Sequence, residues 1–123
     1  IKNTKRLYPT FYASSENELY KFHKKNYILY NMMECGLIDY IKERILPSSI
    51  ILFGSCAKGT FSEKSDIDIY IESSYVSLNL QKFEKKLNKG INLLFESNIN
   101  NLPPELKNNI VNGVVLDGVI KLR

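Results

Sequence analysis

Two apolar runs separated by a short turn, between residues 49 and 72, restrict the fold more than any other part of the chain. The first run ends in Gly54 and Ser55, and the second contains Asp66 and Asp68 at period two. Because side chains on a strand alternate between its faces, both carboxylates are expected on one face, opposite the neighbouring isoleucines. Adjacent carboxylates repel one another unless a cation lies between them. The pattern therefore predicts a cation site carried by a strand.

The Gly-Ser pair that ends the first run is suited to phosphate. Glycine allows a close backbone approach and Ser55 supplies a hydroxyl. Phosphate beside a divalent metal is the chemistry of nucleotide transfer. Lys58 follows one helical turn later, and it either directs positive charge toward phosphate or is an exposed lysine. Ser65 is a candidate phosphate ligand or a turn residue, and Cys56 is expected to be structural, although a phosphate turn beside it would lower its thiol pKa.

The remaining sequence alternates helical and strand patterns. Apolar residues recur at spacings of three and four from about residue 16 to Leu46, with a break near Gly36 and a capping box at Ser14 or Ser15. Strands are expected at 49–53, 66–72, 91–95 and 114–122, the last as one strand or as a pair broken at Gly118. Helices are expected at 55–58, from 78 to a C-cap at Lys89-Gly90, and from Pro104 to Gly113.

This order of elements predicts an α/β (α+β) fold, with a small mixed β-sheet flanked by helices that we expect on one side of it. The first two strands are joined by only about a dozen residues, too few for a crossover helix, so they are expected to be antiparallel. Residues 1–15 are interpreted as an extended arm or the end of an upstream unit, and residues 16–46 as an N-terminal helical segment. Because the sequence begins at Ile1 rather than Met, we expect further sequence upstream.

Composition narrows the function classes. The chain has 123 residues, 44% of them hydrophobic, and a net charge of +4. Its lysines are scattered without a long basic run, which favours a solvated surface over a track for a polyanion. The two cysteines show neither metal-site spacing nor a disulfide framework, so a reducing cytoplasm is the expected location. No apolar run is long enough to cross a membrane.

The string FGSCAKGTFSEKSDIDIYI at positions 53–71 resembles the signature of the DNA polymerase beta-like nucleotidyltransferase superfamily, and within it the minimal nucleotidyltransferase (MNT) group. The later strand INLLFE, a proline-led helix and a G-x-V-L tail extend the resemblance over about residues 40–122. It implies a nucleotidyltransferase core at 47–123. It also implies that the two aspartates are catalytic and bind one or two Mg²⁺ or Mn²⁺, while Gly54 and Ser55 cradle the phosphates of an NTP, ATP being the expected one. AMP would then pass to an acceptor hydroxyl with release of pyrophosphate.

The chain departs from this pattern at one position. Active members of the superfamily carry a third carboxylate on the next core strand, where this chain has Asn92. Asparagine offers a neutral oxygen and cannot act as a base. Glu96 shares the strand parity of Asn92 but lies about 13 Å further along, and Glu72 continues the face of the aspartate pair. Three readings stay open: activity with Asn92 or Glu96 completing the site, completion by a partner, or binding without turnover.

Partners are inferred from the resemblance and from aromatic residues. The resemblance to minimal nucleotidyltransferases implies pairing with a small helical protein, as the antitoxin of a toxin–antitoxin system, so such a partner, or a homo-oligomer, is expected. The basic aromatic segment 2–12 suggests an upstream DNA-binding unit, and therefore nucleic acid. His23, the only histidine, is expected to be a solvated helix residue. A tyrosine stripe at helical spacing predicts core or an interface: Tyr20, Tyr27, Tyr30 and Tyr40.

Overall fold

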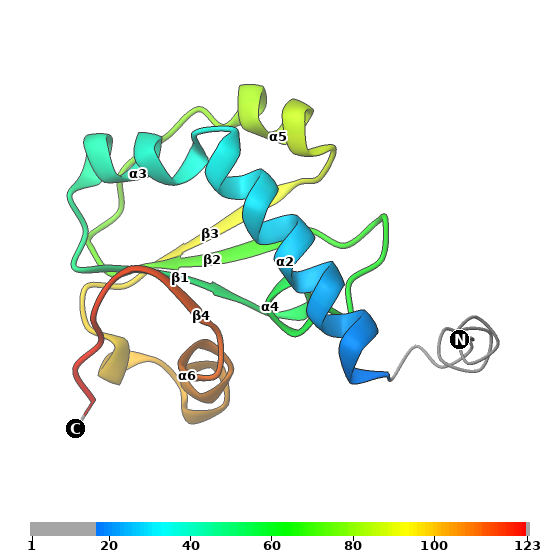
Figure 1. The fold of residues 1–123 in the computed structure, drawn as a ribbon. Coiled ribbons are helices and arrows are strands. Elements are labelled where there is room, and N and C mark those ends of the chain that lie inside the picture. Colours follow the sequence, from blue (N-terminus) through cyan, green and yellow to red (C-terminus); the bar gives the residue numbers. More distant parts are fainter. Residues whose placement is uncertain (1–16, 123) are drawn as a thin grey trace, which may run out of the picture.

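The computed structural model describes residues 17–122 and contains one four-stranded sheet with the order β3-β2-β1-β4 (Figure 1). Strand β1 is antiparallel to both β2 and β4, whereas β2 and β3 are parallel. The mixed sheet and the antiparallel pairing of the first two strands are therefore confirmed. The strands are β1 (Ser49–Phe53), β2 (Ile67–Ile71), β3 (Ile91–Phe95) and β4 (Val114–Gly118).

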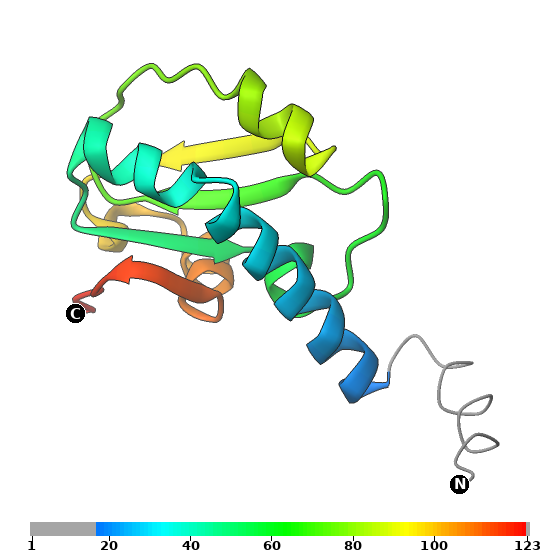
Figure 2. The same ribbon diagram turned by 45° about the horizontal axis from the view of Figure 1, so that its top comes forward.

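Helices cover both faces of the sheet, so the expectation that they lie on one side is wrong. The helices are α2 (Glu18–Glu34), α3 (Leu37–Ile45), α4 (Ser55–Lys58), α5 (Gln81–Leu87), the 3₁₀ turn η1 (Ile99–Asn101) and α6 (Pro104–Val111). Figure 2 shows α3 and α5 above the strands, the blue helix α2 crossing in front of them, and the orange helix α6 on the other side. The reason lies in the strands, because Ile51 and Tyr70 are fully buried on the α6 face with Ile110, while Ile50 and Ile69 pack toward α2 and α3. A strand with apolar residues on both faces requires cover on both.

The N-terminal helical segment is a pair of helices. Gly36, at φ +89°, separates α2 from α3, which confirms the predicted break. Ser14 and Ser15 lie outside the described residues, and the N-cap of α2 is Asn17, whose side chain accepts hydrogen bonds from the backbone N–H groups of Leu19 and Tyr20. The arm expected at 1–15 also falls outside the described residues.

Two predicted element ends differ from the structure. Helix α5 begins at Gln81 rather than near residue 78, and its C-cap is Asn88 at φ +55° rather than the Lys89-Gly90 pair. An asparagine in the left-handed conformation therefore ends the helix, as a glycine was expected to do. Strand β4 is single and ends at Gly118, so the strand pair is not formed.

Most of the tyrosine stripe is exposed rather than core. Tyr27 and Tyr30 are 67% and 68% exposed on the outer face of α2, and Tyr20 is also exposed. Only Tyr40 packs inward, with its ring 5.1 Å from that of Phe83. In the described part of the chain, no helix has both the length and the apolar character needed to cross a membrane.

Candidate metal and nucleotide site

Three polar side chains converge where the two parallel strands begin. Asp66 immediately precedes β2, Asp68 lies within β2, and the register of the sheet pairs Asp68 with Asn92 on β3. The amide Nδ2 of Asn92 donates hydrogen bonds to Asp66 Oδ2 at 3.3 Å and to Asp68 Oδ1 at 3.1 Å. Asp66 and Asn92 are exposed and Asp68 is half-buried. The structure thus brings together the two aspartates and the residue that stands in the third acidic position.

Glycine backbones enclose the two carboxylates. At Gly54, which has φ +77°, an ideal Cβ would lie 2.7 Å from Asp68 Oδ2. At Gly90 it would lie 2.7 Å from Asp66 Oδ1. Side chains at either position would therefore displace a carboxylate. Ser55 follows Gly54 as the first residue of α4 and is half-buried, so the start of the helix follows directly on the glycine that lies against Asp68.

Two lysines hold the loop between Gly59 and Asp66. The Nζ of Lys89 donates to the carbonyl oxygens of Ser62 at 2.7 Å and Ser65 at 3.0 Å. The Nζ of Lys24 donates to the carbonyl oxygen of Phe61 and lies 4.5 Å from the centroid of its ring. Sequence reasoning missed both lysines, because no local pattern connects residues that far from the loop. Their contacts fix the backbone that leads into the first aspartate.

Ser65 and Lys58 are the other two candidate phosphate ligands, and their surroundings differ from those of Gly54 and Ser55. Ser65 Oγ accepts a hydrogen bond from the backbone N–H of Ser62 at 2.9 Å, the geometry of a turn residue. Lys58 is exposed and lines a hollow of about 460 Å³ with Phe22 and Lys25 of α2. Neither of the two ion pairs in the described residues joins Lys58 to an aspartate of the pair.

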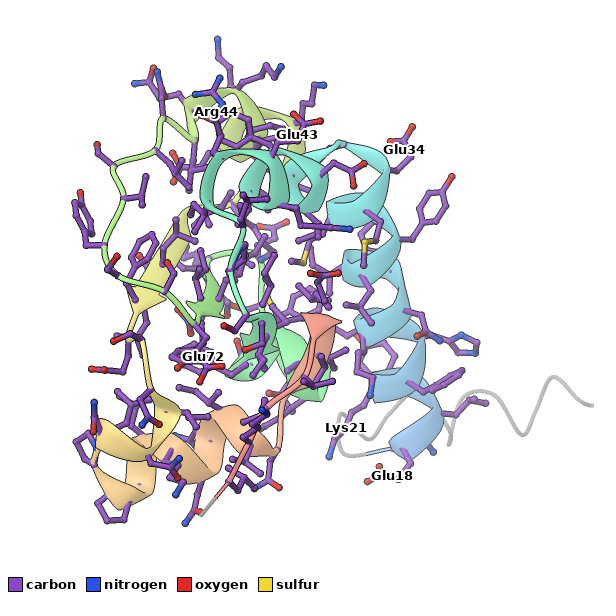
Figure 3. All side chains as sticks on the ribbon, turned by 90° about the vertical axis from the view of Figure 1, so that its left-hand side faces the viewer. Glu18, Lys21, Glu34, Glu43, Arg44 and Glu72 are labelled. Atoms are coloured by element: carbon purple, nitrogen blue, oxygen red, sulfur yellow. The ribbon has the colours of Figure 1, made fainter. Side chains whose placement is uncertain are left out.

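Glu72 and Glu96 lie at the far end of β2 and β3, away from the aspartate pair. The hydroxyl of Tyr70 donates to the carbonyl oxygen of Glu96 at 2.9 Å and to the Glu72 carboxylate at 3.4 Å. Burial, and then the negative charge of Glu72, raises the pKa of Tyr70. The Glu72 carboxylate also accepts from the backbone of Ile99, and that of Glu96 from the amide of Asn101. Figure 3 shows Glu72 at the end of the sheet that faces the viewer. Both acids therefore support the turn around η1.

The donor set available to a metal is small. Within residues 17–122, no group of three or more His, Cys, Asp and Glu side chains is placed to hold a metal ion. The two aspartates supply carboxylate oxygens, and Asn92 can add only its amide oxygen. Carboxylate oxygens that leave positions for phosphate and water suit Mg²⁺. The residues present therefore fit a magnesium-type ion held by two carboxylates, with an amide in reach.

Cys56 lies behind the site and is predicted to be unreactive. Its buried thiol donates to the carbonyl oxygen of Asp66 at 3.6 Å, and burial raises its pKa rather than lowering it. At pH 8 the thiolate fraction is therefore small. We expect iodoacetamide to modify the partly exposed Cys35 well before Cys56, as measured by mass spectrometry of the native protein. Equal rates in native protein would contradict this burial, and unfolded protein supplies the control in which both thiols react.

Comparison with known proteins gives a family match. Residues 34–117 match the family model described as nucleotidyltransferase domain. The matched range includes the Gly-Ser turn, both aspartates and Asn92. A search of curated proteins found no match. Since the family model covers more than half of the sequence, the chain belongs to the nucleotidyltransferase domain family.

Proposed function

We propose that this chain transfers a nucleoside monophosphate, AMP in the first instance, from an NTP to an acceptor hydroxyl in a reaction that requires Mg²⁺ or Mn²⁺. One observation carries the proposal. Asp66 and Asp68 direct their carboxylates to one amide group beside the Gly54 turn. Two carboxylates held that close, on the exposed edge of a glycine turn, are arranged for a cation and a phosphate chain.

Each residue of the site has a distinct part in the proposal. Asp66 and Asp68 would hold the metal, which when bound supplies positive charge to the phosphates of the nucleotide. Gly54 lets the backbone lie against Asp68, where a side chain would meet its carboxylate. Ser55 offers its hydroxyl and backbone N–H as donors to phosphate oxygens. Gly90 likewise lets the backbone lie against the carboxylate of Asp66.

Asn92 favours a second candidate function, a nucleotide-binding or partner-binding module without turnover, such as the antitoxin of a toxin–antitoxin pair. Its amide already donates to both carboxylates, which is the interaction that a cation would otherwise supply. A neutral amide cannot accept the acceptor's proton. Transfer would then depend on the two aspartates alone or on a partner.

The two functions are separated by incubating the protein with α-labelled ATP, Mg²⁺ and a candidate acceptor pool, and by thermal unfolding with and without ligand. Transfer predicts labelled product and a ligand-dependent rise in Tm. Binding alone predicts the rise without product. A ligand at about 100 times its Kd stabilises by about 2.7 kcal/mol, which is readily measured. If neither Mg²⁺ with ATP nor Mn²⁺ with ATP raises the Tm, the proposal is wrong.

Replacing Asn92 by aspartate tests the third position directly. We expect N92D to lower the Tm in EDTA, because three carboxylates then repel one another, and to raise the metal affinity about tenfold or more. The Tm difference between Mn²⁺ and EDTA should therefore be larger for N92D than for the wild type. N101D is the control, since Asn101 is exposed and contacts Glu96 at the far end of the sheet. A variant that gains no metal response would show that position 92 does not face the ion.

A further inference from the structure

A hollow on the described surface runs along helix α5. It has a volume of about 920 Å³ and is lined by Lys82, Lys85 and Lys89 together with polar residues such as Asn88. A second hollow of about 470 Å³, lined by Tyr40, Arg44 and Asn79, shares Gln81 and Lys82 with it. The two adjoin at these shared residues, and we call them together the α5 groove, defined by Tyr40, Arg44, Asn79, Gln81, Lys82, Phe83, Glu84, Lys85, Asn88, Lys89 and Gly90.

The α5 groove carries positive charge that nearby acids do not neutralise. Lys82 and Lys85 are three residues apart on α5, which places them on one side of the helix, and Lys89 follows its C-cap Asn88. The ion pairs found in residues 17–122 involve none of them. Glu84 is the acid that lines the groove, and its carboxylate accepts a hydrogen bond from the backbone of Ile91 at 2.9 Å. The Nζ of Lys89 donates to the backbone carbonyl oxygens of the loop at Ser62, Glu63 and Ser65 and contacts no acid there.

One end of the groove reaches the aspartate pair. Gly90 lines the groove and lies against Asp66, where an ideal Cβ would be 2.7 Å from Oδ1. Lys89 donates to the carbonyl oxygen of Ser65, the residue before Asp66. A molecule lying in the groove therefore ends beside the carboxylates.

The other end of the groove offers a flat, cationic surface. The guanidinium of Arg44 lies 4.8 Å from the centroid of the Tyr40 ring. Figure 3 shows Arg44 beside the ribbon of α5. An aromatic ring with a stacked guanidinium, next to a lysine-lined channel, is the combination on which single-stranded nucleic acids bind, with phosphates on the lysines and bases on the π surfaces.

We propose that the α5 groove binds the phosphate backbone of a single-stranded nucleic acid and presents its terminal hydroxyl to the aspartate pair, so that the acceptor is a nucleic-acid end. This inference rests on the proposed function. The terminal hydroxyl oxygen bonds to the α-phosphorus of the NTP, the bond from that phosphorus to the β-phosphate oxygen breaks, and pyrophosphate leaves with the electron pair. The hydroxyl proton passes to water. Lys82 and Lys85 of α5 and Arg44 of α3 thus line one path toward the aspartate pair.

The test compares two neighbouring lysines on the same helix. Lys85 lines the groove, whereas Lys86 is exposed and lines neither hollow. We expect a fluorescein-labelled single-stranded 12-mer, made as RNA and as DNA, to bind the wild type and K86E with similar affinity in anisotropy titrations. K85E should bind on the order of tenfold more weakly, and its salt dependence should fall by about 0.7 in log–log slope. K82E provides a second groove variant if K85E unfolds.

Three results would overturn the inference: no binding of either oligonucleotide, equal losses in K85E and K86E, or a polyglutamate peptide that binds as tightly with the same dependence on Lys85. Affinity for one oligonucleotide type only would support it and identify the sugar. Binding is measured without NTP or metal, and also in D68N, which should retain it. Failure of transfer with intact oligonucleotide binding therefore counts against the proposed function alone, while ATP-dependent stabilisation without oligonucleotide binding counts against the groove alone.

Discussion

Replacing Asp68 by asparagine is expected to lower nucleotidyl transfer by about 10³-fold or more. Asp68 is half-buried, its carboxylate accepts from Asn92, and the backbone of Gly54 lies directly against it. The amide that replaces it keeps the shape but removes the charge that would hold the metal, a contribution of several kcal/mol. At 1.36 kcal/mol for each tenfold change, about 4 kcal/mol corresponds to that loss. The rate is measured by release of pyrophosphate or by labelled product.

The controls separate chemistry from folding. D68N should retain or slightly raise the Tm in EDTA, because one of two neighbouring negative charges is gone. D39N is the matched replacement, since Asp39 is an exposed aspartate in the first turn of α3. It should leave both transfer and metal-dependent stabilisation unchanged. Transfer by D68N at the wild-type rate would remove the aspartate pair from the mechanism.

Replacing Gly59 by alanine is expected to cost about 3 kcal/mol of the free energy of unfolding. Gly59 has φ +75°, and an ideal Cβ there would overlap the carbonyl oxygen of Lys21 and lie 2.8 Å from its carbonyl carbon. Left-handed backbone strain contributes about 1–2 kcal/mol, and the overlap with rigid helix backbone adds about 1–3 kcal/mol. With a slope of about 1–3 kcal/mol per molar urea, the unfolding midpoint should fall by about 1–3 M.

Gly36 provides the matched control for this substitution. It has φ +89°, but nothing lies within 4 Å of the position of its Cβ. G36A should therefore show the backbone strain without the overlap, a loss of about 1–2 kcal/mol. The difference between the two variants measures the close approach of α4 to α2. Equal losses in the two variants would show that α2 moves away at no cost.

The sequence predicted the parts of the fold that depend on local patterns. Strands β1 and β3 have the predicted bounds, and α4 forms where one helical turn was expected after the Gly-Ser pair. Period-two alternation placed Asp66 and Asp68 on one face, where Asn92 joins them. These features follow from apolar spacing and from glycine and proline signals, which operate over a few residues.

Features that depend on distant contacts were not predicted. The C-cap of α5 was assigned to Gly90, but Asn88 takes that conformation and Gly90 lies against Asp66 instead. The anchoring of the loop by Lys24 and Lys89 joins residues from separate helical and turn segments. The helix layer on the second face of the sheet, around Ile110, was not predicted. The burial of Tyr70 on that face becomes evident only when α6 is placed against it.

The contacts between α2 and the loop before Asp66 have a consequence for where the functional unit begins. The family match starts at residue 34, so it leaves out Lys24, which holds Phe61, and Lys21, against which Gly59 packs. A chain trimmed to the match would keep every oxygen proposed to face the metal but lose the support of the segment that positions them. The residues that the family model matches and the residues that support the site are thus different stretches of the chain. Helix α2 supports the loop before Asp66, but the match includes only its last residue.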